Sequence, residues 1–381
     1  MKKKKQNRAW LQVGLVVVFI IGIVIALYPF YVGALNNFID QYRIGKISKE
    51  NNAANQAQLK ALQEKNKQIS QNTASDPFKN ASESTKTNLK EHLIGNVIIP
   101  KINVNLPLFD TTNSKTIQYG AAVLDGTSFP VGGVGTHSVV SSHRGLPERK
   151  LFTDLNKLKK GDIFIFEVYN QKIAYEIESI KTVLPTDTSV LAVESGRDIA
   201  SLLTCTPYML NTHRLVLKGH RVPYTAEMDQ QIKDTDRNIM LQQGLILAGC
   251  VLLFGFLLYV LFKTIHAAIL RKKRFDLSFY CVSETGAPLA GIKFGLYDKK
   301  GKKNLLRAQK PYVVASDATG KVSFTDLPGA LYSVKEPNAK RSQRIIAGIK
   351  RKSQTAGMLY PRKKQASVIS YLNGIFKWRH R

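Results

Sequence analysis

Residues 202–222 read LLTCTPYMLNTHRLVLKGHRV, which is two apolar, strand-like runs separated by a loop. Cys205 ends the first run, and Arg214 stands at the start of the second. Adjacent strands joined by a short loop would bring Cys205 and Arg214 to the same end of one sheet. A nearby cation favours the nucleophilic thiolate, and a guanidinium can donate to the oxyanion formed when a thiolate attacks an amide carbonyl. The stretch therefore predicts a site for cysteine chemistry.

The chain around this hairpin, residues 93–222, has the pattern of short strands. Segments such as GNVIIPKI, HSVVSSH, DIFIFEVYN and KIAYEIESIKTVLP are rich in Val, Ile, Phe and Tyr, with Gly, Pro, Asn and Asp between them. Such residues favour strands, and strands at this spacing are typical of a sandwich or barrel. We therefore predict a mainly β domain.

Cysteine usage alone leaves the nature of Cys205 open. The chain has three cysteines, and Cys250 lies inside a long apolar run while Cys281 lies beyond it. Cys205 thus has no evident disulfide partner in its own part of the chain. It is either an inert buried thiol or a reactive one.

Histidine is the usual side chain for proton transfer near neutral pH. The candidates near Cys205 are His137, His143, His213 and His220. His143 lies in SSHRGLP, where a strand meets a turn, so its ring could reach a cleft. His137 would lie at the other end of that strand, and His213 would point to the face opposite Arg214. Taken singly, each can also be a plain surface histidine, but the position of His143 favours it.

The charge of the chain gathers at its ends. The formal net charge is +29, from 56 basic and 27 acidic residues. Residues 1–8 carry four Lys and one Arg, and residues 263–381 carry 26 basic and 6 acidic residues, so the middle is nearly balanced. Such an excess predicts a partner with negative charge, either a membrane surface or nucleic acid.

Two apolar stretches separate these zones. Residues 9–39 and 238–262 contain no charged side chain, and each can span a hydrocarbon core, which needs about 20 apolar residues. A buried core helix is the alternative, but basic flanks disfavour it. The first stretch could be a cleaved signal peptide, yet its apolar run is long and no small-residue cleavage site is evident. The positive-inside rule then predicts a two-pass membrane protein with both termini cytoplasmic and the middle domain extracellular.

The middle domain resembles the sortase family. LLTC followed by TPYMLNTHRLVLKGHR, with HSVVSSHRGLP upstream, gives His, Cys and Arg in the family's order. The resemblance is to class C, the pilin-polymerising sortases, because of the two flanking apolar segments, a polar helical stretch before the domain, and Asp76-Pro77-Phe78, which is similar to the lid motif of that class. One departure is Met209, where this class often has Gly.

The resemblance implies a cysteine transpeptidase and a role for each residue. Cys205 would be the nucleophile, His143 the proton-transfer partner and Arg214 the oxyanion stabiliser, while Asp76 would pair with Arg214 and Phe78 would shield Cys205. The enzyme would cleave an LPXTG-like sorting signal between Thr and Gly, form a thioester, and pass the acyl group to a lysine of the next pilin subunit. Residual hydrolysis is expected, and no cofactor or metal.

The C-terminal part resembles a collagen-adhesin B-type (Cna-B) domain. SETGAPLAGIKFGLYDKKG and SDATGKVSFTDLPGALYSVKE carry this likeness. That family often forms an internal isopeptide bond; Glu336 matches its Glu, but Tyr280 or Cys281 stands at the Lys position, so we expect no such bond. The final strand of the domain is not recognisable.

Three hypotheses remain for this region: a remnant without a role, a cytoplasmic interaction module whose basic tail contacts anionic lipid, or a domain on the other side of the membrane. Nucleic acid is not expected as a partner, because aromatic residues do not interleave with the basic ones beyond Phe376 and Trp378.

Two alternatives to pilin polymerisation remain open. One is a wall-anchoring sortase that uses a peptidoglycan amine, and the other is a non-catalytic membrane scaffold with an adhesin-like module.

The predicted order of the chain is a basic N-terminus (1–8), a transmembrane signal anchor (9–35), a helical extension with the lid (36–92), a catalytic β-barrel (93–225), a linker (226–240), a transmembrane helix (241–262), a basic juxtamembrane segment (263–276), a partial Cna-B-like β-sandwich (277–336) and a basic tail (337–381).

Overall fold

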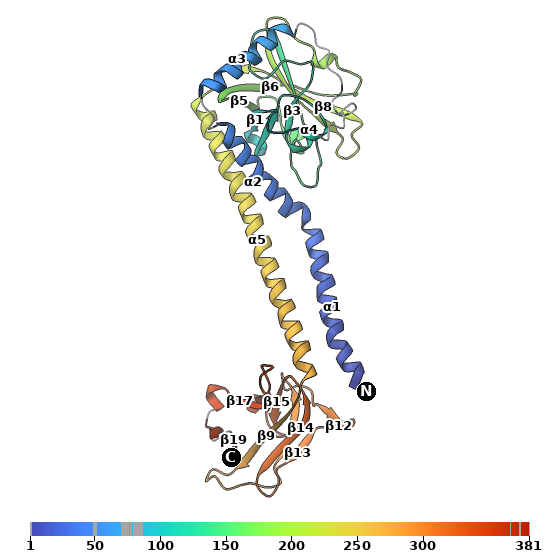
Figure 1. The fold of residues 1–381 in the computed structure, drawn as a ribbon, viewed down its shortest axis with the longest axis vertical. Helices are drawn as coiled ribbons and strands as arrows, with labels where there is room; N and C mark the ends of the chain where they lie inside the picture. The colour runs from blue at the N-terminus through green and yellow to red at the C-terminus, as the bar shows by residue number, and fades with distance from the viewer. Residues whose placement is uncertain are drawn as a thin grey trace. The chain divides into compact units, whose positions relative to one another are not determined.

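The computed structural model describes residues 2–48, 52–69, 76, 78, 87–365, 367–372 and 375–380. The chain divides into two compact units, one formed by Val24–Leu253 and the other by Met1–Ile23 together with Phe254–Arg381. Figure 1 shows the elements of both units, coloured along the chain. Each unit is described by itself.

The first unit contains a closed β-barrel, which confirms the predicted mainly β fold. Its strands follow one another in the order β1-β2-β3-β4-β7-β8-β6-β5. The pairs β2–β3 and β4–β7 are parallel, and the others are antiparallel. The elements are β1 (Leu93–Ile99), β2 (Val104–Phe109), α4 (Ser114–Tyr119), β3 (Ala121–Val123), β4 (Thr136–Ser141), β5 (Ile163–Val168), β6 (Gln171–Val183), β7 (Asp198–Thr206) and β8 (His213–Val222).

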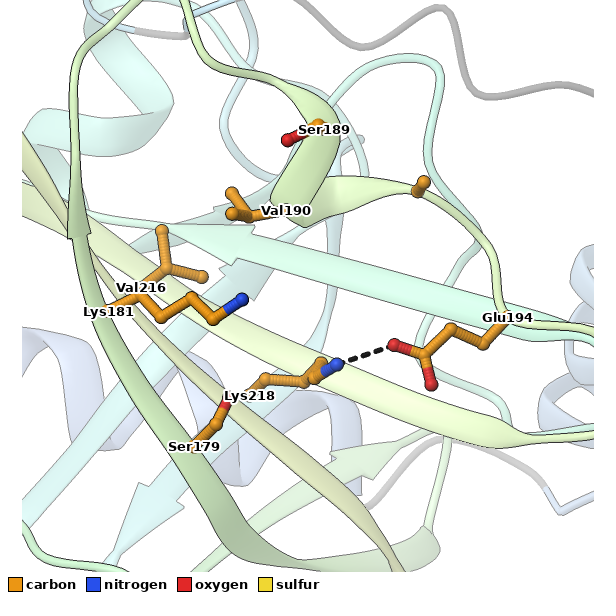
Figure 2. Close-up of a pocket in the computed structure, with 8 residues that line it drawn as sticks. Ser179, Lys181, Ser189, Val190, Glu194, Val216 and Lys218 are labelled. Atoms are coloured by element: carbon orange, nitrogen blue, oxygen red, sulfur yellow. Dashed lines mark hydrogen bonds and ion pairs between the residues drawn. The ribbon is translucent and has the colours of Figure 1, made fainter.

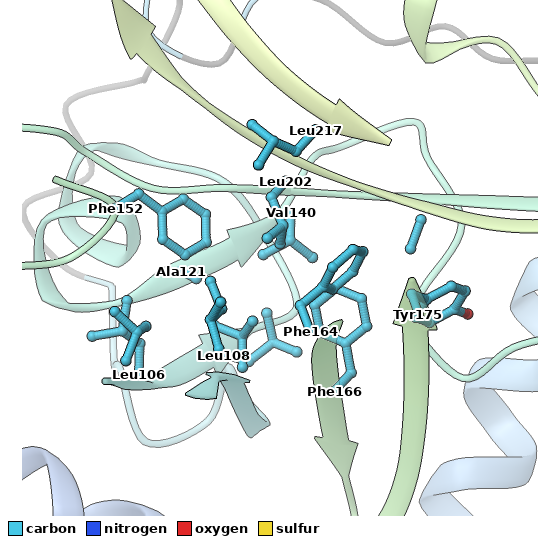
Figure 3. Packing of buried hydrophobic residues seen from close by; sticks show 14 of the residues in the cluster. Leu106, Leu108, Ala121, Val140, Phe152, Phe164, Phe166, Tyr175, Leu202 and Leu217 are labelled. Atoms are coloured by element: carbon cyan, nitrogen blue, oxygen red, sulfur yellow. The ribbon is translucent and has the colours of Figure 1, made fainter. Parts of the chain in front are cut away.

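Large apolar side chains fill the barrel (Figure 3). Phe164 of β5 stacks on Tyr175 of β6 with ring centroids 5.6 Å apart, and Phe166 meets the same tyrosine ring edge-on at 5.8 Å. Leu202 of β7 and Leu217 of β8 are fully buried in the same cluster. Burial of each such side chain is worth roughly 1.5–3 kcal/mol. Because side chains alternate along a strand, this packing turns the intervening residues of β7 and β8 to the outer face of the barrel.

Helices cover part of this barrel. They are α2 (Tyr28–Ser48), α3 (Asn52–Gln68) and the first turns of α5 (Ala226–Lys272). Leu62 of α3 joins the barrel core, and Ile232 of α5 is buried against β1, β5 and β6. Residues 226–240 were predicted as a linker, and they are instead helical. The acidic first turn of α5 favours a helix start there, and Asp229 accepts a hydrogen bond from Lys172 of β6 at 2.6 Å.

Among the described residues, α1 (Lys2–Ala26) and α5 are the helices that are long and apolar enough to cross a membrane, judged by length and composition. The predicted anchor 9–35 is divided, because α1 ends at Ala26 and α2 begins at Tyr28. Pro29 lies in the first turn of α2, where its missing N–H is not needed. The apolar stretch is therefore two helices in succession.

The second unit contains a two-sheet β domain at the end of α5. Its sheets have the orders β13-β10-β15-β16-β17 and β14-β9-β19-β18, with a small β11-β12 pair beside them. Phe279, Phe294 and Trp378 meet in its core with ring centroids 4.9–5.5 Å apart. The strands are β9 (Arg274–Val282), β10 (Lys293–Asp298), β11 (Leu306–Arg307), β12 (Lys310–Pro311), β13 (Val313–Ala315), β14 (Lys321–Pro328), β15 (Leu331–Lys335), β16 (Ile345–Gly348), β17 (Met358–Tyr360), β18 (Ile369–Leu372) and β19 (Ile375–Arg379).

The prediction of a basic tail at 337–381 is wrong, because β16 to β19 lie within it. The final strand is β19, which pairs in parallel with β9 and places Trp378 opposite Cys281. In β19 the buried Phe376 and Trp378 alternate with exposed neighbours, among them Lys377 and Arg379. The basic residues therefore lie on the solvent-exposed face of β19. Their large number hid, in the sequence, the alternation of buried and exposed side chains along this strand.

Candidate active site

Cys205 and Arg214 lie on neighbouring strands at one end of the barrel. Cys205 of β7 is the residue directly opposite Arg214 of β8 in the antiparallel pairing. Both are nearly buried, at 5 % and 8 % exposure. The hairpin turn between them therefore brings a thiol and a guanidinium to the same edge, as the sequence pattern predicted.

The two side chains share the outer face of the barrel with an apolar patch. Leu203 and Val216, two residues before Cys205 and two after Arg214, pack with Leu191 of the β6–β7 connection. A pocket opens beside Arg214 and is lined by Asp76, Val183, Leu184, Pro185, Asp187, Thr188, Val190, Leu191, Leu203 and Val216. This wall of the site was missed from the sequence, although TVLPTDTSVLAV combines apolar residues with loop residues.

A second pocket adjoins the first, since Val190 and Val216 line both. Figure 2 shows its polar side, where Lys218 donates to Glu194 and Lys181 points into the same space. The surface next to Arg214 is thus apolar at first and charged further along β8.

His143 follows β4, which runs parallel to β7. The loop that carries it is tied to β7 by the Ser142 N–H, which donates to the Leu203 carbonyl at 3.2 Å, and by the Thr204 hydroxyl, which donates to the Ser142 carbonyl at 2.8 Å. His143 is thereby placed at the same end of the barrel as Cys205. Among the described residues its ring makes an aromatic contact with Phe78.

Two residues of the predicted lid close over this end. The Asp76 carboxylate accepts two hydrogen bonds from Arg214, from Nε at 2.7 Å and from Nη2 at 2.6 Å. The Phe78 ring lies 5.5 Å from the His143 ring, centroid to centroid, and 5.1 Å from the Arg214 guanidinium carbon. Pro77 lies outside the described residues. Asp76 thus binds Nε and Nη2 of Arg214, and Phe78 contacts both Arg214 and the His143 ring.

Burial controls the charge of the reactive groups. Burial raises the pKa of the Cys205 thiol to about 11, where Arg214 opposes the shift and Asp76 adds to it. Burial also lowers the pKa of His143, which favours the neutral imidazole. Both shifts favour the neutral forms, the thiol of Cys205 and the imidazole of His143.

The other histidines have different surroundings. His137 is buried, with Nδ1 bound to the Ala192 carbonyl and Nε2 to the Ser201 hydroxyl, both at 2.8 Å. It is a structural residue of the barrel and lies at the end of β4 that is remote from His143. His213 bonds to its neighbour Thr212 at 2.9 Å, and His220 lies 3.5 Å from Glu178.

The turn after Cys205 packs on the residues after His143, a contact that sequence reasoning missed. Arg144 donates to the Thr206 hydroxyl at 3.1 Å and lies 6.0 Å from the centre of the Tyr208 ring. Tyr208 also covers Gly145, where a Cβ would meet the ring at 2.7 Å. The HRG sequence beside His143 is the signal that could have indicated these residues. They hold the turn after Cys205 and the loop after His143 together.

Helix α2 contacts the far side of the same loop. Asp40 accepts a hydrogen bond from Arg149, and the two side chains are 5 % and 8 % exposed. Arg149 also donates to the Tyr119 carbonyl at 3.1 Å, and Asn36 donates to the Glu148 carbonyl at 3.4 Å. The helix that follows the first apolar segment is thus bound to the loop that begins at His143.

The described residues contain no group of three or more His, Cys, Asp or Glu side chains arranged to hold a metal ion.

Comparison with known proteins finds one family match within each unit. Residues 97–222 match the sortase domain family, and residues 276–344 match the prealbumin-like fold domain family SpaA. Sortase A of Bacillus anthracis is 29 % identical over 139 residues, which is 36 % of this chain and 64 % of that protein. Sortase A of Listeria monocytogenes is 26 % identical over 211 residues, which is 54 % of this chain and 88 % of that protein.

Solved structures of streptococcal sortases C are also similar to the chain. The crystal structure of Streptococcus pneumoniae Sortase C is 38 % identical, covers 49 % of this chain and 98 % of its own, and gives a TM-score of 0.46. The predicted combination of a sortase domain with a Cna-B-like domain is confirmed. The chain therefore contains a sortase domain at residues 97–222 and a prealbumin-like domain at residues 276–344.

Proposed function

We propose that this protein is a membrane-anchored cysteine transpeptidase of the pilin-polymerising class, with Cys205, His143 and Arg214 as its catalytic residues. The observation that carries the proposal is the pairing of Cys205 with Arg214 across β7 and β8, with the His143 loop tied to the same strand. Membership of the sortase family supports a cysteine transpeptidase in general terms.

The first half-reaction forms a thioester. The Cys205 thiol gives its proton to His143, and the thiolate attacks the Thr carbonyl of an LPXTG-like sorting signal. Arg214 donates to the oxyanion of the tetrahedral intermediate, which a guanidinium stabilises better than a point charge. His143 then protonates the leaving Gly amine as the C–N bond breaks.

The second half-reaction passes the acyl group on. A lysine amine of a pilin subunit attacks the thioester, His143 accepts its proton, and the Cys205 thiolate leaves as the isopeptide bond forms. Dividing one difficult amide exchange into two steps is the benefit of a covalent nucleophile. The apolar wall around Leu191 and Val216 is the surface where we place the Leu-Pro part of the signal.

The lid must open before this reaction. Arg214 cannot bind an oxyanion while Asp76 occupies two of its donors, and Asp76 also raises the pKa of Cys205. We propose that Asp76 and Phe78 inhibit the free enzyme and move aside for the sorting signal. An acidic residue on the catalytic arginine supports the pilin-polymerising class over a wall-anchoring enzyme.

The location follows from the two apolar helices and the charge at their ends. We propose that α1 and α5 cross the membrane, with both termini in the cytoplasm and the barrel outside. A pilin lysine and a sorting signal would both be reached on that side.

The test is mass spectrometry of the full chain in neutral detergent, incubated with a Leu-Pro-x-Thr-Gly peptide. We expect a thioester adduct on Cys205 that disappears when a lysine-bearing pilin is added. Cys281→Ala is the matched control, because it removes another buried thiol and should leave the adduct unchanged.

Three outcomes separate the alternatives. An adduct released by a lysine-bearing pilin supports pilin polymerisation, whereas release by amino-glycine peptides alone favours the wall-anchoring alternative. If no adduct forms even in Asp76→Ala/Phe78→Ala, the lid is not what prevents the reaction. A non-catalytic scaffold then explains the protein better than a transpeptidase.

A further inference from the structure

We infer that the prealbumin-like domain binds anionic lipid headgroups through six basic residues at the end of α5. These residues, called the basic collar below, are Arg271, Lys272, Lys273, Lys350, Arg351 and Lys352. The inference goes beyond the proposed transpeptidase activity and uses none of its residues. It requires that α1 and α5 lie in a membrane.

The domain packs directly on the end of the helix. Leu270 of α5 is 8 % exposed and belongs to the core cluster of the domain. The Gly329 N–H donates to the Lys273 carbonyl at 2.8 Å, and a Cβ on Gly329 would lie 2.0 Å from the Leu270 carbonyl oxygen. No flexible linker separates them, so the domain is held beside the helix end.

The second half of the collar comes from a distant part of the sequence. Lys350, Arg351 and Lys352 follow the buried Ile349, and the Lys273 ammonium donates to the Lys352 carbonyl at 2.6 Å. The side-chain oxygen of Gln354 accepts hydrogen bonds from the Lys350 and Arg351 amides at 2.6 and 2.9 Å. This loop is therefore fixed next to the residues that leave the helix.

Trp10 of α1 marks the level of the membrane interface. Tryptophan prefers the headgroup region, and Trp10 stands at the start of the apolar stretch Ala9–Ala26. Lys272 lies 5.0 Å from the centre of its ring. Ala9 and Val13 pack with Ala268 on the same side, so the two helices meet here. The collar thus lies at the depth where lipid phosphates are found.

The charge of the collar is not neutralised within the described parts of the chain. None of its six residues is ion-paired with a carboxylate there, whereas the neighbouring Arg274 lies 3.8 Å from Asp326. Five of the six are exposed, and Lys273 is half-buried. Each basic residue near an anionic surface strengthens binding about fivefold. Six cations gathered at one helix end fit a layer of headgroup phosphates better than a single free anion.

The experiment is native mass spectrometry of the full chain in neutral detergent, titrated with phosphatidylglycerol. The collar variant is Lys350→Gln/Arg351→Gln/Lys352→Gln. The control, Lys293→Gln/Lys321→Gln/Lys377→Gln, removes the same charge from exposed positions at the other end of the strands, where Lys321 and Lys377 face Tyr280 rather than Arg274. Parallel titrations use glycerol phosphate and a short oligonucleotide.

We expect the collar variant to lose about a hundredfold in lipid affinity, and the control to lose less than threefold. Equal losses in both variants would reduce the effect to net charge and overturn the inference. Tighter binding of the oligonucleotide would overturn it in favour of nucleic acid, and equal binding of glycerol phosphate would show an isolated phosphate site. Thioester formation on Cys205 should be unchanged in both variants, so its failure would concern the transpeptidase proposal alone.

Discussion

The Asp76 carboxylate holds the Arg214 guanidinium through two parallel hydrogen bonds, from Nε at 2.7 Å and Nη2 at 2.6 Å. Bidentate pairs of this kind are among the strongest polar contacts in proteins. The pair places a negative charge next to a group proposed to stabilise an oxyanion. In the function proposed above, this pair therefore protects the covered site and keeps it inactive.

Asp76→Asn should raise the rate at which iodoacetamide alkylates Cys205 at neutral pH. The substitution removes the negative charge that raises the pKa of the thiol and leaves Arg214 to favour the thiolate. We expect an increase of about tenfold, equal to one unit of pKa. Asp110→Asn is a control, because that carboxylate pairs with His92 at 2.8 Å outside the site. An unchanged rate in Asp76→Asn would show that the lid does not restrain Cys205.

The pH dependence of this alkylation is a separate prediction. Burial raises the pKa of Cys205 to about 11, so the thiolate fraction should increase about tenfold for each pH unit and level off only near that value. Rates are measured from pH 7 to 11 after subtraction of the signal from Cys205→Ala. A plateau near pH 8 in the wild type would contradict the effect of burial.

Arg214→Lys should reduce thioester formation by about 100- to 1,000-fold, which is typical of losing one oxyanion donor. Lysine keeps the charge but cannot present the two-donor fork that Asp76 and the oxyanion both require. His213→Ala is the matched control on the adjacent residue, because the His213 side chain bonds to Thr212, while the carbonyl that accepts from Arg214 is kept in the variant. The measurement is acyl-enzyme yield per unit time. Wild-type rates in Arg214→Lys would remove the proposed role.

Trp378→Ala tests whether the last strand completes the prealbumin-like domain. Trp378 is 6 % exposed and packs on Phe279 and Phe294, so its loss should lower the free energy of unfolding by about 3–5 kcal/mol. Lys377→Ala, on the exposed face of the same strand, should change it by less than about 0.5 kcal/mol. Thermal unfolding of the full chain, followed by near-UV circular dichroism, measures both. Equal stability of the two variants would indicate that β19 is dispensable.

The sequence predicted most where local patterns were strong. The run from Leu202 to Cys205 and the strand-like run at Arg214 predicted their hairpin, and the spacing of runs rich in Val, Ile, Phe and Tyr predicted a sandwich or barrel. The prediction of a basic tail at residues 337–381 failed because a strand whose exposed face is basic has the composition of a disordered segment. Only the burial of Trp378 shows that side chains in β19 alternate between the core and solvent.

Contacts between distant segments left no local signal. The pocket wall depends on the β6–β7 connection folding back over Val216, and the Asp40–Arg149 pair joins residues far apart in the chain. In the sequence, Asp40 and Arg149 each have the pattern of an ordinary charged surface residue. Tertiary packing, which has no fixed sequence spacing, decides which charges become buried.

The Asp40–Arg149 pair leads to the last prediction, which concerns the position of His143. Both side chains are nearly buried, and burial raises the pKa of Asp40 while Arg149 opposes that shift. Removing one partner of a buried pair costs about 3–5 kcal/mol, because the other charge is left without compensation. The cost falls on the loop that begins at His143, since Arg149 belongs to it and Asn36 holds its neighbour Glu148.

Asp40→Asn should therefore slow thioester formation about tenfold while leaving the alkylation of Cys205 unchanged. Alkylation needs only the thiolate, whereas peptide cleavage also needs a correctly placed His143. Arg43→Gln is the control, because Arg43 reaches Asp40 at 3.5 Å from a more exposed position. In the double variant Asp40→Asn/Arg149→Gln, the loss in the rate of thioester formation, expressed as free energy, should be smaller than the sum of the losses in the two single variants. If the ratio of cleavage to alkylation is the same in Asp40→Asn and the wild type, α2 does not position His143.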